Sequence, residues 1–252
     1  MKSWEREYTR DTWWRHRGVL TLGDLSGVEV EYSRDVWELL REKRNRAIKI
    51  MRILSHLSRE VIVHGSLARG DVKSTSDIDI VVIQPVSPGL LELSLERAGY
   101  TVYHKEIVQA TPNYTPKIYF YLDPEEEIVV STPLSDLKER EREFYKWGGE
   151  LDLPGLLEGK RVPGVSKDLK LIIPTERGHK EIEVVGNESI VARVIGVSIE
   201  TVLERVRVLE RRKEHGRTGV FLKVTIPAGE SVESVIDELS HKNPYFRRAL
   251  ER

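Results

Sequence analysis

The sequence predicts an α/β (α+β) fold in which helices flank a mixed sheet, followed by a smaller α+β module with winged-helix-like features. Short apolar runs with strand character alternate with amphipathic helical patterns between residues 33 and 147. A stretch rich in glycine and proline, residues 151–166, interrupts this alternation. Two helical patterns and a strand pattern follow it, so we expect domains at residues 1–150 and 166–252.

The elements of the first domain follow from local patterns. Residues 1–32 are irregular and aromatic-rich, and with the helix expected over residues 33–57 they form an N-terminal helical extension. Strands are expected over residues 61–63, 77–83, 101–109, 117–122 and 128–130, and helices over residues 87–98 and 134–147. One face of the first helix is basic, which we interpret as a solvated face, with a phosphate-facing patch as the alternative. Its cations are Arg41, Lys43, Arg44, Arg46, Lys49 and Arg52.

The second domain resembles a helix-turn-helix with a wing. A hairpin is expected over residues 169–185, helices over 188–195 and 199–212, a wing strand over 220–226, and a last helix from Ser231. The small, turn and apolar positions of the motif fall on Ala192, Gly196 and Val202. Nearby cations could neutralise nucleic-acid phosphates, although interspersed glutamates favour a packing or dimerisation role instead. These cations are Arg205, Arg207, Arg211, Arg212, Lys213 and Arg217.

The composition excludes several classes of protein. The chain has 252 residues and no cysteine, which excludes disulfides, cysteine zinc sites and thiol nucleophiles. Forty Lys and Arg against 41 Asp and Glu give a net charge of −1, so nucleic-acid binding requires a local patch. No apolar run is long enough for a membrane span, and MKSWEREYTR has no signal-peptide core, so we expect a cytoplasmic protein without a membrane partner. The 32% charged residues and scarce side-chain amides also fit a thermophile, or else lineage bias.

Residues 64–82, HGSLARGDVKSTSDIDIVV, carry two features with chemical meaning. In the first, a strand ends at Gly65 and Ser66, and a short helical turn follows. Glycine lets the backbone approach a ligand closely, and amides at a helix start favour an anion. The Ser66 hydroxyl and nearby amides could therefore cradle a phosphate, although many strand-to-helix turns also contain Gly-Ser.

The second feature is a pair of aspartates, Asp77 and Asp79. Because they are two residues apart on a strand, both carboxylates point to the same face. Like charges on a buried strand cost several kcal/mol, and a divalent cation such as Mg²⁺ removes that cost. Alternatively, Asp77 caps the preceding turn and Asp79 pairs with an arginine.

Together the two features resemble the signature of the nucleotidyltransferase superfamily that includes DNA polymerase β, and the chain is similar to archaeal predicted nucleotidyltransferases over roughly residues 35–130. The matching residues are Gly65, Ser66, Ala68, Arg69, Gly70, Ser76, Asp77, Ile78 and Asp79. His64 departs from the pattern, since the family usually has a bulky apolar or aromatic residue there. It either lies in the core with a hydrogen bond or lines the nucleotide pocket.

The resemblance implies a nucleotidyltransferase-type fold and a magnesium-dependent reaction. A nucleoside monophosphate would pass from an NTP, with ATP the expected nucleotide, to an acceptor hydroxyl, and pyrophosphate would leave. Asp77 and Asp79 would hold one or two Mg²⁺ ions, while Gly65, Ser66 and Arg69 would contact the nucleotide. Arg69 could instead pair with Asp71 or Asp77 and brace the loop.

The family also uses a third carboxylate, as catalytic residue and metal ligand, on a strand after the helix that follows Asp-x-Asp. Glu127 is the first choice, followed by Asp123 and then Glu106. In the alternative interpretation, residues 125–127 form only a solvated turn.

Three functions remain open at this stage. The first is transfer to an acceptor, with an RNA 3′ end favoured over a protein side chain or a small molecule. The second is a nucleotide-sensing, nucleic-acid-binding regulator without catalysis. The third is an antitoxin-like nucleotidyltransferase that modifies a partner protein, and the oligomeric state is left open in all three.

Overall fold

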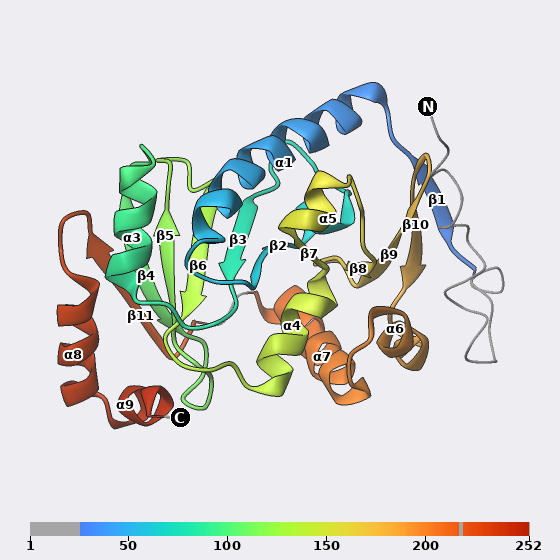
Figure 1. Ribbon diagram of the computed structural model, residues 1–252. Coiled ribbons are helices and arrows are strands. Elements are labelled where there is room, and N and C mark those ends of the chain that lie inside the picture. The colour runs from blue at the N-terminus through green and yellow to red at the C-terminus, as the bar shows by residue number, and fades with distance from the viewer. Residues whose placement is uncertain (1–25, 217–218, 252) are drawn as a thin grey trace.

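The computed structural model describes residues 26–216 and 219–251 and shows two sheets with helices packed around them (Figure 1). Within these residues, the larger sheet has seven strands in the order β11-β4-β5-β6-β3-β2-β7, and the smaller has four in the order β1-β10-β9-β8. Most of the aromatic N-terminal segment, and Arg217 of the basic cluster, lie outside the described residues.

The larger sheet is mixed, as predicted. Its strands are β2 (Val61–His64), β3 (Ile78–Val82), β4 (His104–Gln109), β5 (Lys117–Tyr121), β6 (Ile128–Pro133), β7 (Glu150–Asp152) and β11 (Leu222–Pro227). Strands β3 and β6 pair in parallel, and the other neighbouring pairs in this sheet are antiparallel. The parallel pair places the start of β6 beside the start of β3, where the two aspartates lie.

One face of this sheet carries the main hydrophobic core. The helices that contribute to it are α1 (Arg34–Leu54), α3 (Pro88–Arg97), α5 (Leu153–Leu157), α8 (Val232–Lys242) and α9 (Pro244–Leu250). Helix α1 forms because apolar residues recur with the helical period, and Leu40, Ala47 and Met51 are buried on one side. The opposite face of the sheet is covered in part by α4 (Glu139–Gly148), whose Tyr145 packs on Ile62 and Val81.

The smaller sheet has its own core. Its strands are β1 (Val28–Glu31), β8 (Gly164–Val165), β9 (Lys170–Thr175) and β10 (Gly178–Glu183), and α6 (Glu188–Ile195) and α7 (Ile199–His215) pack on it. Trp147 of α4 belongs to this core, so α4 contacts both sheets. Strand β1 corrects the expectation of irregular structure up to residue 32, because VEVE has the period of a strand.

The expected wing strand instead extends the larger sheet. Strand β11 pairs with β4 in an antiparallel register that joins Val224 to Ile107. Ile226 is fully buried in the main core and Val224 packs against it, so the apolar side of β11 is covered by the sheet's own helices. Residues 222–227 therefore do not flank α6 and α7 as a wing would.

The glycine- and proline-rich stretch, expected to be a boundary, contains ordered elements. It holds the end of β7, all of α5 and strand β8. The Asp152 carboxylate caps α5 by accepting a hydrogen bond from the Gly155 backbone N–H at 2.9 Å, and Leu156 is buried. The larger sheet takes strands from both sides of this stretch, and the division into folding units at residues 1–150 and 166–252 stays a prediction.

No helix in the described part of the chain combines the length and the apolar character needed to cross a lipid bilayer.

Candidate active site

The turn after β2 presents Ser66 at the start of a short helix, α2 (Ser66–Arg69). Gly65 has a φ of 79°, a conformation that side-chain-bearing residues rarely adopt, and its carbonyl accepts hydrogen bonds from the N–H groups of Ala68 and Arg69. The Ser66 hydroxyl makes no hydrogen bond with any other described residue. The turn therefore leaves a hydroxyl and the first amides of α2 available to an anion.

Asp77 and Asp79 lie beside this turn. Asp77 directly precedes β3, and Asp79 on β3 is paired in register with His64 at the end of β2. Within the described residues, neither carboxylate accepts a hydrogen bond or forms an ion pair. The Ser76 hydroxyl caps the turn by accepting a hydrogen bond from the Lys73 N–H at 2.9 Å. Among the described residues, Asp77 therefore does not cap this turn, and Asp79 does not pair with an arginine.

The electrostatics of this pair suit a cation. Burial, together with the charge of Asp77, raises the pKa of Asp79 to about 6, although Lys167 acts in the opposite direction. Two unpaired carboxylate groups of this kind are hard oxygen ligands whose repulsion a divalent ion would remove. No cluster of three metal-ligating side chains occurs among residues 26–216 and 219–251.

A stability measurement tests whether the buried charge of Asp79 destabilises the fold. The pKa of Asp79 is raised from 3.8 to about 6, so ionised Asp79 destabilises the metal-free fold above about pH 6, and the cost disappears as the pH falls below 3.8. We expect Asp79→Asn to raise the free energy of unfolding in urea by about 2–3 kcal/mol at pH 8 without divalent ions. At pH 4 the gain should be small, and an equal gain at both values would contradict the burial of the charge.

The three candidates for the third carboxylate all have other partners. Glu127 forms ion pairs with Lys43 and with Arg46 (2.8 Å for the latter). Asp123 accepts the backbone N–H groups of Glu127 and Ile128, which fixes the hairpin turn. Glu106 pairs with Lys223 at 2.9 Å and also accepts hydrogen bonds from the hydroxyls of Tyr121 and Thr225.

Of the three candidates, Glu127 lies closest to the aspartates in the pairing of β3 with β6. Its carbonyl accepts the Ile78 N–H at 2.7 Å, and the next position on the same face of β6, Val129, lies in register with Asp79. Burial pushes the pKa of Glu127 up, but the hydrogen bonds and charges of Lys43 and Arg46 outweigh it and hold the pKa below its ordinary value. Glu127 as a metal ligand and catalytic residue stays a prediction, and these ion pairs count against it.

Removing the charge of Glu127 should cost stability. We expect Glu127→Gln to lower the free energy of unfolding by about 1–2 kcal/mol at pH 7, because buried Lys43 loses its ion pair while Glu127 itself is partly solvated. The pKa of Glu127 is lowered, so its contribution is present above 4.5 and is lost as the pH falls further. Urea titrations at pH 7 and pH 3.5 should show the difference shrinking, and a difference that grows at low pH would contradict the ion pairs.

Two cations of α1 reach inward, which the sequence interpretation missed. Lys43 donates to the Ser76 carbonyl at 2.8 Å as well as to Glu127, directly before the Asp77 position. Arg44 donates to the carbonyls of Leu67, Ala68 and Lys160. The signal was their spacing, since positions 43 and 44 continue the buried face between Leu40 and Ala47. These side chains hold both halves of the site, so the basic face of α1 is not wholly solvated.

Arg69 braces the loop instead of facing an open pocket. Its guanidinium pairs with Asp71 at 2.9 Å and donates to the Gly148 carbonyl at 2.5 Å, and the side chain is buried. This is the alternative weighed against nucleotide contact. A contact between Arg69 and the nucleotide stays a prediction, and these bonds count against it.

His64 lies against α4, with its ring 5.1 Å from that of Phe144 and 5.3 Å from that of Tyr145. A Cβ on Gly148 would come within 2.3 Å of its Nε2, so the close packing requires glycine there. Burial, with the charges of Arg69 and Lys117, lowers the pKa of His64 to about 3. His64 is therefore neutral at physiological pH, and its ring packs on α4 with its buried Nε2 lacking a partner among the described residues.

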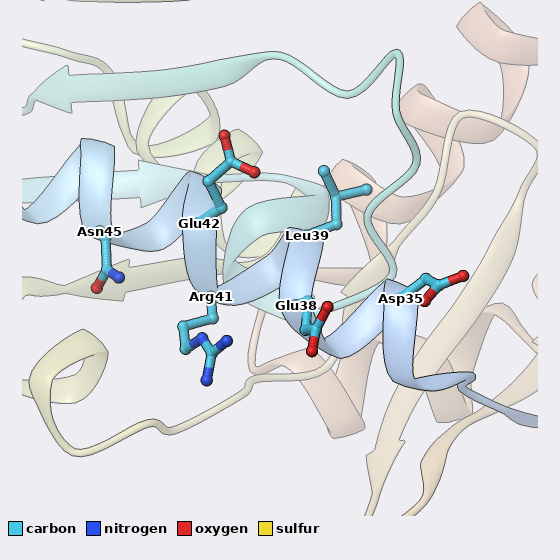
Figure 2. Close-up of a pocket in the computed structure, with 6 residues that line it drawn as sticks. All are labelled: Asp35, Glu38, Leu39, Arg41, Glu42 and Asn45. Atoms are coloured by element: carbon cyan, nitrogen blue, oxygen red, sulfur yellow. The ribbon is translucent and has the colours of Figure 1, made fainter.

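A shallow depression on α1 lies apart from these residues. It is lined by Asp35, Glu38, Leu39, Arg41, Glu42 and Asn45 (Figure 2). None of the aspartates or turn residues of the site contributes to it, and its lining mixes both signs of charge.

The comparison with protein families agrees with this geometry. Residues 44–141, from the middle of α1 into α4, match the family model described as a nucleotidyltransferase domain. These residues are therefore similar to a nucleotidyltransferase domain. The match contains Gly65, Ser66, Asp77 and Asp79 and covers less than half of the chain. No curated protein and no solved structure matches the chain.

The nucleotidyltransferase domain supports assignment of the chain as a nucleotidyltransferase enzyme, which transfers nucleoside monophosphates in general terms. Domains of this kind use an NTP and a divalent metal. The smaller sheet and helices α6 to α9 lie outside the match.

Proposed function

We propose that the chain is a magnesium-dependent nucleotidyltransferase that moves a nucleoside monophosphate from ATP to the 3′ hydroxyl of an RNA, with release of pyrophosphate. The observation that carries the proposal is the pair of carboxylates, Asp77 and Asp79, beside the hydroxyl of Ser66, three groups that have no partner among residues 26–216 and 219–251. The choice of ATP rests on the resemblance alone, and the choice of RNA on the cations of α7.

In this proposal Asp77 and Asp79 hold the Mg²⁺. When bound, the ion supplies positive charge to the phosphates and acidity to a coordinated hydroxyl. The Ser66 hydroxyl and the first amides of α2 bind phosphate oxygens. The acceptor oxygen would then form a bond to the α-phosphorus and lose its proton to solvent, while the bond from that phosphorus to the bridging oxygen breaks and pyrophosphate leaves.

We place Lys43, Glu127 and Arg46 in a positioning role. Lys43 connects the Ser76 carbonyl to Glu127, and the Glu127 carbonyl binds the Ile78 N–H, so the residues on both sides of Asp77 are fixed. Carboxylates held in one orientation need no rearrangement when the metal binds.

Transfer of a label from each α-³²P-labelled NTP, with Mg²⁺ and with or without total RNA, tests this function. Label should move to RNA, most efficiently from ATP, and the Asp77→Ala, Asp79→Ala double variant should transfer none. Label retained on protein would instead indicate a protein-modifying enzyme. Labelling of neither acceptor, despite NTP binding, would contradict the proposal.

A second candidate, a nucleotide sensor without catalysis, is favoured by one observation. The position on β6 in register with Asp79 is Val129, and the other carboxylates considered have partners of their own. A sensor would bind NTP and release no pyrophosphate, so the labelling experiment separates the two.

A further inference from the structure

A group of cations lies between β5, α4 and α7, outside the motif residues. Lys117 of β5 donates to the Tyr145 hydroxyl at 2.9 Å, and its Nζ lies 4.7 Å from the centre of the Tyr145 ring. Arg205 of α7 lies over the Phe144 ring at 4.8 Å. Both cations therefore gather on the two aromatic rings of α4, and both side chains are partly exposed.

The guanidinium of Arg205 forms no ion pair with any described carboxylate. Its Nε is buried and has no hydrogen-bond partner among residues 26–216 and 219–251. Burial and the charge of Arg212 lower its pKa, while Tyr114 and Glu204 act in the opposite direction. Glu204 itself accepts hydrogen bonds from the Tyr114 hydroxyl and from Arg140.

The group shares a face of the larger sheet with the aspartates. Asp79 is in register with Val129, and Val129 with Tyr121, so these side chains point to one face. Lys117 lies four residues from Tyr121 on β5 and so points to the same face. Lys117 lies two strands from Asp79 across the sheet and four residues away along β5, which corresponds to roughly 16 Å. Several nucleotides of an RNA can span that distance.

The first turn of α7 is not free to dock in a groove. The Glu143 carboxylate of α4 accepts the Ser198 N–H at 2.8 Å and the hydroxyls of Ser198 and Thr201. A helix-turn-helix protein reads bases with the start of its second helix, which α4 covers here. The cations beyond the first turn of α7 remain available to an anionic partner.

We propose that Lys117 and Arg205 bind the backbone phosphates of a single-stranded RNA whose 3′ end reaches Asp77 and Asp79. This inference rests on the proposed function and names where its acceptor binds. A guanidinium that no described carboxylate neutralises gains a charge-assisted contact when a phosphate reaches its exposed part, and the aromatic rings keep both cations in place. Lys117 and Arg205 would contact phosphates and not bases, so the affinity should not depend on the RNA sequence.

Fluorescence anisotropy of a 5′-fluorescein-labelled 12-nucleotide RNA tests the site without NTP or Mg²⁺. We expect the Lys117→Met, Arg205→Gln double variant to bind the RNA at least about tenfold more weakly at low salt. The slope of log affinity against log salt concentration should decrease by the equivalent of about two phosphate contacts. The matched control is Arg207→Gln, Arg211→Gln, which removes two exposed cations of the same helix and should change the affinity less than threefold. Arg205→Lys keeps the charge and should keep most of the affinity.

Several outcomes would overturn the inference. Equal losses in the two double variants would show that diffuse charge binds the RNA. Binding of inorganic phosphate at millimolar concentration by a protein that does not bind the oligonucleotide would show a small phosphorylated acceptor instead. Wild-type protein that releases pyrophosphate but does not bind the oligonucleotide would contradict this inference alone, while absence of pyrophosphate release would count against the proposed function. Thermal melting of each variant checks that a loss of binding is not a loss of fold.

Discussion

Replacement of Asp77 by asparagine is expected to lower pyrophosphate release by at least about a thousandfold at saturating Mg²⁺. Asparagine keeps the shape of the side chain and removes the charge that would hold the metal beside the α-phosphate. A loss of about 4 kcal/mol of transition-state stabilisation corresponds to that factor. Asp77 is exposed and has no partner among the described residues, so the fold should be unaffected. Steady-state rates, with unfolding measured in parallel, check both statements.

Asp136→Asn provides the matched control. Asp136 is also exposed and is not part of the Gly-Ser and Asp-x-Asp features. This variant should keep the wild-type rate within about twofold, since surface substitutions of this kind change little. If Asp77→Asn retained more than a tenth of the rate, a metal role for Asp77 would be wrong.

Replacement of Arg44 by methionine is expected to lower the free energy of unfolding by about 3 kcal/mol. The buried guanidinium donates to three carbonyls, at 2.7 to 3.2 Å, and its loss leaves them without donors. Burial, and then the charge of Arg161, lowers the pKa of Arg44 to about 10, so it remains charged at pH 7. Because two of the carbonyls belong to Leu67 and Ala68, the KM for the NTP should rise as well. Urea denaturation and NTP kinetics measure the two effects.

Arg41→Met is the comparison for this variant. Arg41 is exposed on the same helix, at the rim of the shallow depression (Figure 2). We expect it to change stability by less than about 0.5 kcal/mol. Equal effects of the two substitutions would show that Arg44 does not hold the turn.

The geometry of the Gly-Ser turn and of the two aspartates could be predicted from the sequence because both features are local. The Gly65 turn depends on a conformation that glycine favours, and the spacing of Asp77 and Asp79 fixes their common face. The mixed sheet and the helical period of α1 followed from the same kind of evidence, and residues 43 and 44 could have been read as buried from that period. The charges of residues 43 and 44 favoured exposure to solvent. Their burial is explained by carbonyl groups that are distant in sequence and accept their hydrogen bonds.

The remaining features depend on long-range pairing. Strand β11 carries a regular alternation that does not say which sheet edge it joins, so its wing assignment was wrong. The ion pairs of Glu127 arise from α1, more than 80 residues away in sequence. The meeting of Lys117 and Arg205 on Phe144 likewise has no local signal, because it requires β5, α4 and α7 to be in place.

Pyrophosphate release from each NTP, with and without Mg²⁺ and RNA, tests the central claim most directly. We expect release that requires Mg²⁺, rises with RNA, and is absent in the Asp77→Ala, Asp79→Ala double variant, whose fold should be retained. Release that persists in the double variant would contradict the assignment of the site, and no release by the wild-type protein in any mixture would contradict catalysis itself.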